Sequence, residues 1–431
     1  MGPRKLYPFL LTFLLIIYLR KTNTQTLDDA KDLLKKLFIT DAYNKVVRPT
    51  CDQSATTNVS MSFYLTGIID FDSQKEILTT SGYINIVWND CKLIWNPLDY
   101  NNTYYILVPQ DSVWTPDVDL RNSMSKLKGL GSSNFYLSVY NNGSVEWYPY
   151  GTWKSACNVD ITYFPFDTQS CDLKFGTWAY TTGDVSITVD QDAINLTFYE
   201  ENTAWTIVET SVNAINYMYS PVAVFTIKLN RKPLFFLLNI LLPVIMLSLL
   251  NVCIFVLPAQ SGEKASFAVT VFLSLVIFLS IVMGTLPQNS EEISFLGVYL
   301  VIMAAFSTLA VILTMFQIRL NSRDADVDPI PSWLIKLQVM VEVIRCRRCS
   351  KVHPATYSQD EVVMFSSDRT NLTGDTTSEK TKSKPQASNQ QPIVTWNQIC
   401  SSLDFVFFWV FSIGTVITSV TIVAIYNIDQ R

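Results

Sequence analysis

Four apolar stretches in the second half of the chain set the strongest limit on its fold. They run from Leu234 to Leu257, from Ala265 to Leu286, from Ile293 to Ile318 and from Leu403 to Ile425. Each is about 20 residues or longer, which is the length that a helix needs to cross a bilayer. The first three are joined by short polar links, whereas a long polar segment separates the third from the fourth. The sequence therefore predicts a membrane protein with four spanning helices.

The amino terminus has the pattern of an export signal. Two basic residues precede an apolar run over residues 6–19, and two more basic residues follow it. This run is shorter than a spanning helix requires, and its flanks are typical of a secretory signal peptide. We expect a signal peptide over residues 1–24, cleaved near Thr24. Because no clear Ala-x-Ala site follows the run, an uncleaved anchor is the alternative.

Residues 25–232 precede the first spanning stretch and have the composition of a β-sheet domain. Short runs rich in Tyr, Trp, Val, Ile and Thr are broken by Asn, Gly, Pro and Asp, which is typical of strands joined by turns. We predict an extracellular β-sandwich. Four sequons in this part could carry glycans on the outer side, at Asn58, Asn101, Asn142 and Asn195.

The distribution of basic residues orients the chain in the membrane. Lys and Arg are concentrated just after the third spanning stretch, which by the positive-inside rule places residues 320–401 in the cytoplasm. Within this link, Trp333–Arg348 has the spacing of a short amphipathic helix at the membrane interface, and Ser358–Gln391 has the polar composition of a disordered segment.

The predicted fold is thus an extracellular β-sandwich followed by a four-helix transmembrane bundle, with a largely disordered cytoplasmic link that contains short amphipathic helices. We expect helices 1 to 3 over residues 233–319, helix 4 over 402–427 and an extracellular tail over 428–431. These features predict a multi-pass protein of the plasma membrane with an extracellular amino terminus.

Enzymatic activity is disfavoured by the residues that are present. The one histidine lies in the cytoplasmic link, and the sequence has no nucleophile motif, phosphate-binding loop or metal-ligand cluster. Cys346 and Cys349 with His353 supply too few ligands for a zinc site. We therefore expect no catalysis, cofactor or metal. The net charge of -5 sums several faces of a membrane protein, and no basic patch indicates a nucleic-acid partner.

Four cysteines lie in the exported part of the chain, where disulfides form: Cys51, Cys91, Cys157 and Cys171. Cys51 and Cys91 flank two expected strands that turn near residues 72–74. Because antiparallel pairing of these strands would bring the two cysteines together, we hypothesise a disulfide between them.

The segment from Cys157 to Cys171 reads CNVDITYFPFDTQSC, with Phe164-Pro165-Phe166-Asp167 at its centre. It resembles the signature loop of the Cys-loop receptors, which are pentameric ligand-gated ion channels. The order of four spanning helices after a large outer domain is similar too, and the resemblance extends from about Asp28 to the end of the chain. It implies a disulfide between Cys157 and Cys171. The disulfide and Pro165 would stiffen the loop, whose aromatic tip would contact the membrane domain.

The second spanning stretch carries a stripe of pore-like side chains. Ser266, Thr270, Leu273 and Ile277 recur at intervals of three or four and so share one helix face. Hydroxyls ease ion dehydration, and an apolar ring can gate by dewetting, so the stripe favours a pore lined by several copies. A packing face within a monomeric bundle is the alternative, because small residues also favour helix association.

The stretch GEKASFAVTVFLSLVIFLSIV resembles the pore helix of nicotinic and serotonin-gated cation channels. The resemblance implies that Leu273 forms the hydrophobic gate and that Glu263 belongs to a ring of carboxylates at the cytoplasmic mouth. The Pro-Ala-Arg sequence of anion-selective relatives is absent, so we expect cation selectivity. Gly284 stands where many cation-channel subunits carry a charge, although Glu291 and Glu292 lie nearby, which leaves calcium permeability open.

The resemblance also implies a ligand site between subunits, where aromatic rings attract an ammonium group. It places Trp178 at the main cation contact, with Tyr217 and Tyr219 in the hairpin before the membrane. On the complementary side it places Tyr83, Tyr148 and, as a further candidate, Glu146.

Two departures set the chain apart from acetylcholine-binding subunits. Arg121 stands where those subunits carry tyrosine, and a cation there disfavours a quaternary ammonium. The hairpin from Trp205 to Phe225 also lacks their adjacent cysteine pair. The chain thus resembles a non-α nicotinic subunit, or a homomeric receptor with another agonist.

For coupling between ligand site and pore, the resemblance implies contacts among the segment from Asp70 to Lys75, the tip of the Cys loop, Arg231 and the link around Pro287. We hypothesise a charge network of Asp72, Asp167 and Arg231.

Two functions follow as hypotheses. The first is a subunit of a homo- or hetero-pentameric, cation-selective channel in a synaptic, postsynaptic membrane, gated by a cationic or amine-like agonist. The second is an accessory subunit that needs partner subunits and does not bind agonist alone.

Overall fold

The computed structural model describes residues 27–126, 128–284, 286, 293–323, 328–349 and 394–429. The predicted signal peptide, Pro287, Glu291, Glu292, His353 and the segment Ser358–Gln391 lie outside these residues. The described residues form two compact units. The first comprises residues 27–239 with Ile281–Gly297, and the second comprises Ile240–Ser280 with the described residues from Val298 onward.

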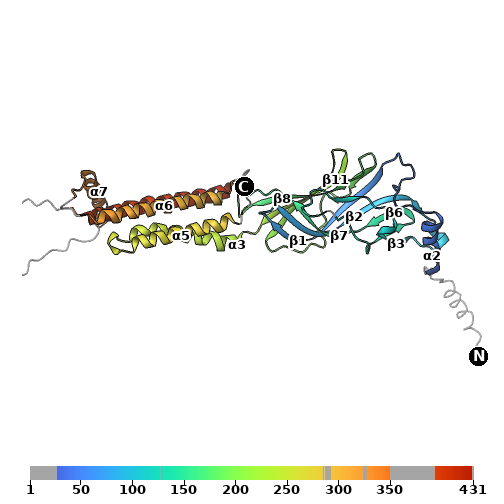
Figure 1. The fold of residues 1–431 in the computed structure, drawn as a ribbon, viewed down its shortest axis with the longest axis horizontal. Coiled ribbons are helices and arrows are strands. Elements are labelled where there is room, and N and C mark those ends of the chain that lie inside the picture. The colour runs from blue at the N-terminus through green and yellow to red at the C-terminus, as the bar shows by residue number, and fades with distance from the viewer. Residues whose placement is uncertain are drawn as a thin grey trace, which may run out of the picture. The chain divides into compact units, whose positions relative to one another are not determined.

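The first unit begins with the helix α2 (Leu27–Lys35) and continues as two β-sheets (Figure 1). The first sheet contains β1 (Thr57–Asp72), β2 (Ile77–Ile94), β3 (Tyr105–Pro109), β5 (Tyr136–Tyr140), β6 (Asn142–Trp147), β7 (Tyr150–Ala156) and β9 (Val185–Val189). Its strands follow the order β3-β5-β6-β2-β1-β9, and β7 also pairs with β2. The second sheet contains β4 (Val118–Leu120), β8 (Thr168–Thr177), β10 (Trp205–Tyr217) and β11 (Ser220–Arg231), in the order β10-β11-β8-β4.

The core of this unit includes a group of aromatic rings from both sheets. Phe63 of β1 lies 5.5 Å from Phe225 of β11 and 6.2 Å from Phe175 of β8, measured between ring centroids. Trp153 of β7 packs edge-on against Phe63 and Phe175. Because successive side chains of a strand point to opposite faces, alternation in the sequence delivers these rings to one interior. The predicted β-sandwich is confirmed.

Both hypothesised disulfides are present. Cys51 bonds to Cys91 and Cys157 bonds to Cys171. The strands β1 and β2 pair antiparallel, with Val59 opposite Trp88 and Asp72 opposite Ile77. Since Cys51 precedes β1 and Cys91 lies near the end of β2, this pairing brings the two cysteines together as expected.

The helices that could cross a membrane follow the sandwich in sequence. They are α3 and α4 (Leu234–Phe236 and Leu242–Cys253, joined by a π-helical turn over Leu237–Leu241), α5 (Lys264–Met283), α6 (Phe295–Asn321) and α8 (Trp396–Asp429). In the described part of the chain, four spans have the necessary length and apolar composition: Leu234–Val256, Lys264–Met283, Phe295–Asn321 and Trp396–Ile422. The four predicted spanning stretches are therefore helical. The exact domain boundaries remain predictions.

Two apolar clusters lie among the described residues of the helical unit. One joins residues from all four spans, among them Phe255, Ala268, Ala310 and Phe411. The other joins the start of α8, at Trp396 and Ile399, to Leu334 of the helix α7 (Ser332–Cys349). The amphipathic helix predicted in the cytoplasmic link is thus present, and its buried residues pack on protein.

Candidate ligand-binding, coupling and pore sites

Trp178 lies at the end of β8 with its ring half exposed, and Arg121 covers that ring. The carbon Cζ of Arg121, which directly follows β4, is 4.1 Å from the ring centroid. The side chain is held there by a hydrogen bond of 2.9 Å from its Nη1 to the backbone oxygen of Thr177. The backbone N–H of Trp178 donates to Asp117 at 3.1 Å. Arg121 and Trp178, which are 57 positions apart in the sequence, therefore form one cation–π pair.

The hairpin of β10 and β11 ends beside the same strand. Val222 of β11 pairs with Gly176 of β8, and the Ser220 hydroxyl donates to the backbone oxygen of Thr177 at 2.9 Å. Tyr217 and Tyr219 lie at the hairpin tip with exposed side chains. The tip turns through positive φ at Met218 and Tyr219. The structure thus presents both hairpin tyrosines to solvent.

Tyr83 and Tyr148 belong to a second aromatic cluster, on the other sheet. Their ring centroids are 6.2 Å apart, and the Tyr83 ring stacks on Tyr64 at 4.7 Å. Phe198 lies 6.4 Å from Tyr83. Phe198 and Tyr64 were not predicted from the sequence, and only the strand register and the path of the chain after β9 reveal them.

A carboxylate completes this second cluster. Glu146 of β6 accepts hydrogen bonds from Tyr140 at 3.1 Å and from Tyr148 at 3.2 Å. Partial burial, together with the nearby Glu146 charge, raises the pKa of Tyr148 to about 12. Both phenols therefore stay neutral at physiological pH, and the cluster combines aromatic faces with one negative charge.

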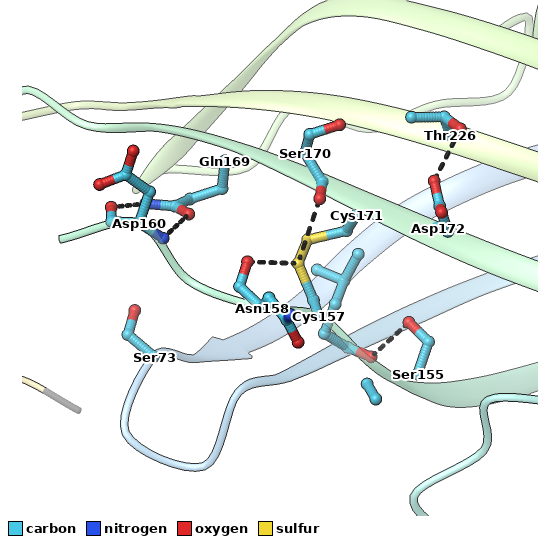
Figure 2. The surroundings of a disulfide bond; sticks show 12 residues. Ser73, Ser155, Cys157, Asn158, Asp160, Gln169, Ser170, Cys171, Asp172 and Thr226 are labelled. Atoms are coloured by element: carbon cyan, nitrogen blue, oxygen red, sulfur yellow. Dashed lines mark hydrogen bonds between the residues drawn. A yellow bond between two sulfur atoms is a disulfide. The ribbon is translucent and has the colours of Figure 1, made fainter. Parts of the chain in front are cut away.

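The side chain of Gln169 forms two hydrogen bonds across the Cys loop. Its side-chain amide donates to the backbone oxygen of Asp160 at 2.7 Å and accepts from the backbone N–H of the same residue at 3.0 Å (Figure 2). Gln169 is buried, because the alternation of β8 turns it to the same face as Cys171. Sequence reasoning missed this residue, although a polar side chain at an inward position of a strand was the available signal.

Asp167 and Arg231 form a two-bond ion pair at the base of the sandwich. Arg231 Nε donates to Asp167 Oδ1 at 2.7 Å, and Nη2 donates to Oδ2 at 3.0 Å. The guanidinium also lies over the rings of Trp205, at 4.2 Å, and Phe164, at 5.0 Å. A buried charge needs partners of this kind to offset its lost hydration.

Asp72, the third member of the hypothesised charge network, lies in a different ion pair. It accepts from Lys75 Nζ at 2.7 Å and from the Lys75 backbone N–H at 3.0 Å. These bonds lower the pKa of the Asp72 carboxyl. The link from this turn to Arg231 is made by Ser73, whose hydroxyl accepts from Nη2 at 3.2 Å.

The tip of the Cys loop contacts the first residues of the helices. Phe164 and Pro165 are buried, and the Phe164 ring packs edge-on against Phe236 at 4.9 Å. Tyr163 lies 5.6 Å from Phe295, whose backbone N–H donates to Thr162 at 3.1 Å. Phe166 closes the turn by donating its N–H to the Tyr163 oxygen at 2.8 Å.

The predicted pore stripe lies on the open side of α5. Ser266, Thr270, Leu273 and Ile277 are all exposed in the single chain. The opposite side of α5 is buried, as the residues Ala268, Val271 and Leu275 show. Glu263, which directly precedes α5, is exposed.

Lys264 was not singled out from the sequence, and it points the other way. Its side chain is fully buried and forms an ion pair with Asp404 of α8. The neighbouring charges Glu263 and Lys264 are therefore separated, with only the carboxylate on the open side.

The sequon asparagines differ in exposure. Asn58 and Asn142 are exposed, whereas Asn101 and Asn195 are partly buried. In the described residues, no group of three or more His, Cys, Asp or Glu side chains is placed to hold a metal ion.

Comparisons with known proteins agree with this architecture. Residues 30–233 match the neurotransmitter-gated ion-channel ligand binding domain, and residues 240–392 match the neurotransmitter-gated ion-channel transmembrane region. The neuronal acetylcholine receptor subunit beta-3 of Homo sapiens is 33% identical over 335 residues, which cover 76% of this chain and 72% of that subunit.

Two other relatives are covered less completely. Neuronal acetylcholine receptor subunit alpha-3 of Bos taurus is 31% identical over 327 residues, covering 74% of this chain and 65% of the relative. Subunit alpha-4 of Homo sapiens is 30% identical over 367 residues, covering 81% of this chain and 57% of the relative. The chain thus spans less than two thirds of the length of these two subunits.

A disulfide-closed loop in a β-sandwich, followed by four helices that could span a membrane, defines the class of ligand-gated ion channels. The chain belongs to the neurotransmitter-gated ion-channel family and is similar to nicotinic acetylcholine receptor subunits. This is a family of plasma-membrane receptors with an extracellular amino-terminal domain, and its members are channels, not enzymes.

Proposed function

We propose that the chain is one subunit of a pentameric, cation-selective channel whose pore is lined by α5. The observation that carries this proposal is that one face of α5 is exposed in the single chain and the opposite face is buried. Ser266, Thr270, Leu273 and Ile277 are left open by the chain's own packing, whereas the opposite face is filled by the other helices. Around a common axis, five such stripes would form hydroxyl rings below apolar rings.

Charge at one end of this pore would select cations. Glu263 is exposed and its neighbour Lys264 is neutralised by Asp404, so five copies would present five carboxylates without competing lysines. A ring of negative charge concentrates cations and repels anions.

Gating by a neurotransmitter would start between sandwiches. The two sets of aromatic candidates lie on different sheets, as a ligand site shared by neighbouring subunits requires. Trp178, Tyr217 and Tyr219 belong to one sheet, and the Tyr83–Tyr148 cluster belongs to the other. An amine would suit the rings of Tyr83 and Tyr148 together with Glu146. The Asp167–Arg231 pair and the tip of the Cys loop would carry the displacement towards the helices.

Oocytes expressing the full chain test this function. We expect agonist-gated current whose reversal potential shifts when external sodium is replaced by a large organic cation, and we expect Glu263→Gln to lower single-channel conductance. The control Glu209→Gln removes an exposed carboxylate from the sandwich and should leave conductance unchanged. A reversal potential that follows chloride would contradict cation selectivity.

An accessory subunit is the second candidate, and the Arg121–Trp178 contact favours it. In that case the chain alone would reach the surface without conducting, and co-expression with a related subunit would restore current. Mass measurement of the purified assembly separates the two candidates by showing whether the chain forms pentamers alone.

A further inference from the structure

The Arg121–Trp178 contact has the geometry of an occupied ammonium site. The guanidinium carbon lies 4.1 Å from the ring centroid, within the range at which a ligand cation is attracted to the negative face of an indole. Trp178 is nonetheless 52% exposed, so part of this residue still faces solvent. A cation from the chain itself thus holds the position that an ammonium ligand would take.

Arg121 is fixed at three points and is not a freely moving surface side chain. Its backbone N–H donates to Lys174 at 2.7 Å, and its Nη1 donates to Thr177 at 2.9 Å. Its stem crosses Gly176, where an added Cβ would lie 3.4 Å from the Arg121 Cγ and 2.8 Å from the Pro221 oxygen. The added Cβ would collide with the Pro221 oxygen and would only touch the Arg121 stem, so glycine at this position permits the close pairing of β8 with β11 beside the packed stem.

The Arg121 charge is left without a carboxylate partner. None of the ion pairs in the described part of the chain includes it. Asp117, the carboxylate that the Trp178 backbone contacts, accepts from the N–H groups of Trp178 and Ala179 through its Oδ2. An unpaired cation repels a second cation on the same ring.

We propose that the Arg121 guanidinium occupies the face of the Trp178 ring and thereby prevents quaternary ammonium ligands from binding to that ring. The inference rests on the proposed ligand site and states which residue sets its specificity. In a receptor, this chain then takes part in ammonium binding only through its Tyr83, Tyr148 and Glu146 cluster, facing the Trp178-type surface of a different subunit.

Removal of the arginine tests the proposal directly. The full chain is purified in lipid nanodiscs, and binding of tetramethylammonium is measured by saturation-transfer NMR on wild type, Arg121→Gln and Lys228→Gln. Lys228 is an exposed cation on β11 of the same sheet, paired with Glu209, so its loss matches the change in charge without uncovering a ring. We expect at least about fivefold tighter binding by Arg121→Gln than by the other two, in line with the strength of a cation–π contact.

The gain must depend on the uncovered ring. Adding Trp178→Ala to Arg121→Gln should return binding to the wild-type level. Equal affinity of Arg121→Gln and Lys228→Gln, or a gain that survives in the double variant, would overturn the proposal.

A second measurement leaves Arg121 in place and does not depend on the folding of the variant. A single 5-fluorotryptophan at position 178 of the otherwise unchanged chain reports on its own ring by fluorine NMR. We expect no saturable shift with tetramethylammonium, and a saturable shift would reject the proposal. Neither NMR measurement requires ion current. A chain that does not conduct can therefore still show the expected effect of Arg121 on binding, and a chain that conducts can still lack it.

Discussion

Asp167 and Arg231 face each other through two hydrogen bonds of 2.7 and 3.0 Å, with 2% and 9% of their side chains exposed. Gln169 donates to the same carboxylate, and Trp205 covers one face of the guanidinium. Protein groups, and not only solvent, therefore stabilise both the Asp167 carboxylate and the Arg231 guanidinium. The pair joins the end of the Cys loop to the last residue of β11, just ahead of the first spanning helix.

Breaking this pair should destabilise the sandwich strongly. We expect Asp167→Asn or Arg231→Gln to lower the free energy of unfolding by about 3–5 kcal/mol, since each leaves a buried charge unpaired. The double variant should lose less than the sum of the two. Thermal unfolding of the full chain in detergent measures this, with Asp72→Asn as a control in a more exposed ion pair. Additive losses would mean that the two side chains act independently.

Sequence patterns were sufficient for features that depend on length and spacing. The four spans followed from runs of apolar residues, and Cys51–Cys91 followed from two strands of similar length around one turn. The exposed stripe on α5 likewise matches the positions that helical spacing puts on one face, from Ser266 to Ile277. In each case the length of an apolar run or the regular spacing of residues is enough to predict the element, or the face of it on which the side chains lie.

Contacts between distant segments could not be predicted in this way. Arg121 was recognised as an unusual residue, but its place over Trp178 depends on the pairing of β4 with β8 and on its hydrogen bond to the Thr177 oxygen. The opposite directions of Glu263 and Lys264 depend on Asp404, which lies 140 residues further along. Asp72 and Arg231 both belong to the base of the sandwich, yet Lys75 is closer in sequence and pairs with Asp72.

The Cys51–Cys91 disulfide should contribute substantially to stability. It closes a loop with a sequence separation of 40, for which chain entropy implies about 4 kcal/mol. We expect the Cys51→Ala/Cys91→Ala variant to unfold at a clearly lower temperature than wild type. Cys253→Ala, which removes a free cysteine, is the control. Equal unfolding temperatures of the double variant and the control would show that the bond adds little.

Asp90 should make stability depend on pH. Its side chain is fully buried and accepts from the Tyr43 hydroxyl at 2.5 Å and from the Lys92 backbone N–H at 2.9 Å. Burial outweighs these bonds and raises the pKa of Asp90 above 3.8. The folded state thus holds a proton at pH values where the unfolded chain has released it. This contribution to stability is fully present below pH 3.8 and is lost as the pH rises through the folded pKa.

The variant Asp90→Asn removes this titration. We expect the unfolding temperature of wild type, relative to that of Asp90→Asn, to fall as the pH rises from about 4 towards 7. Asp111→Asn, at an exposed position, should keep the wild-type pH profile. Parallel profiles for wild type and Asp90→Asn would contradict the assigned pKa direction.

Leu273 offers the sharpest test of the pore, because the chain contains a matched control. Leu273 on α5 and Leu249 on α4 are each 57% exposed, so both are apolar side chains that the single chain leaves uncovered. If five copies of Leu273 meet at the axis, Leu273→Ser hydrates an apolar constriction and lets ions pass without agonist. We expect a standing sodium current in oocytes expressing Leu273→Ser, and none with Leu249→Ser at equal surface expression. Standing current in both variants would point to general damage of the bundle, and its absence in both would place the gate elsewhere.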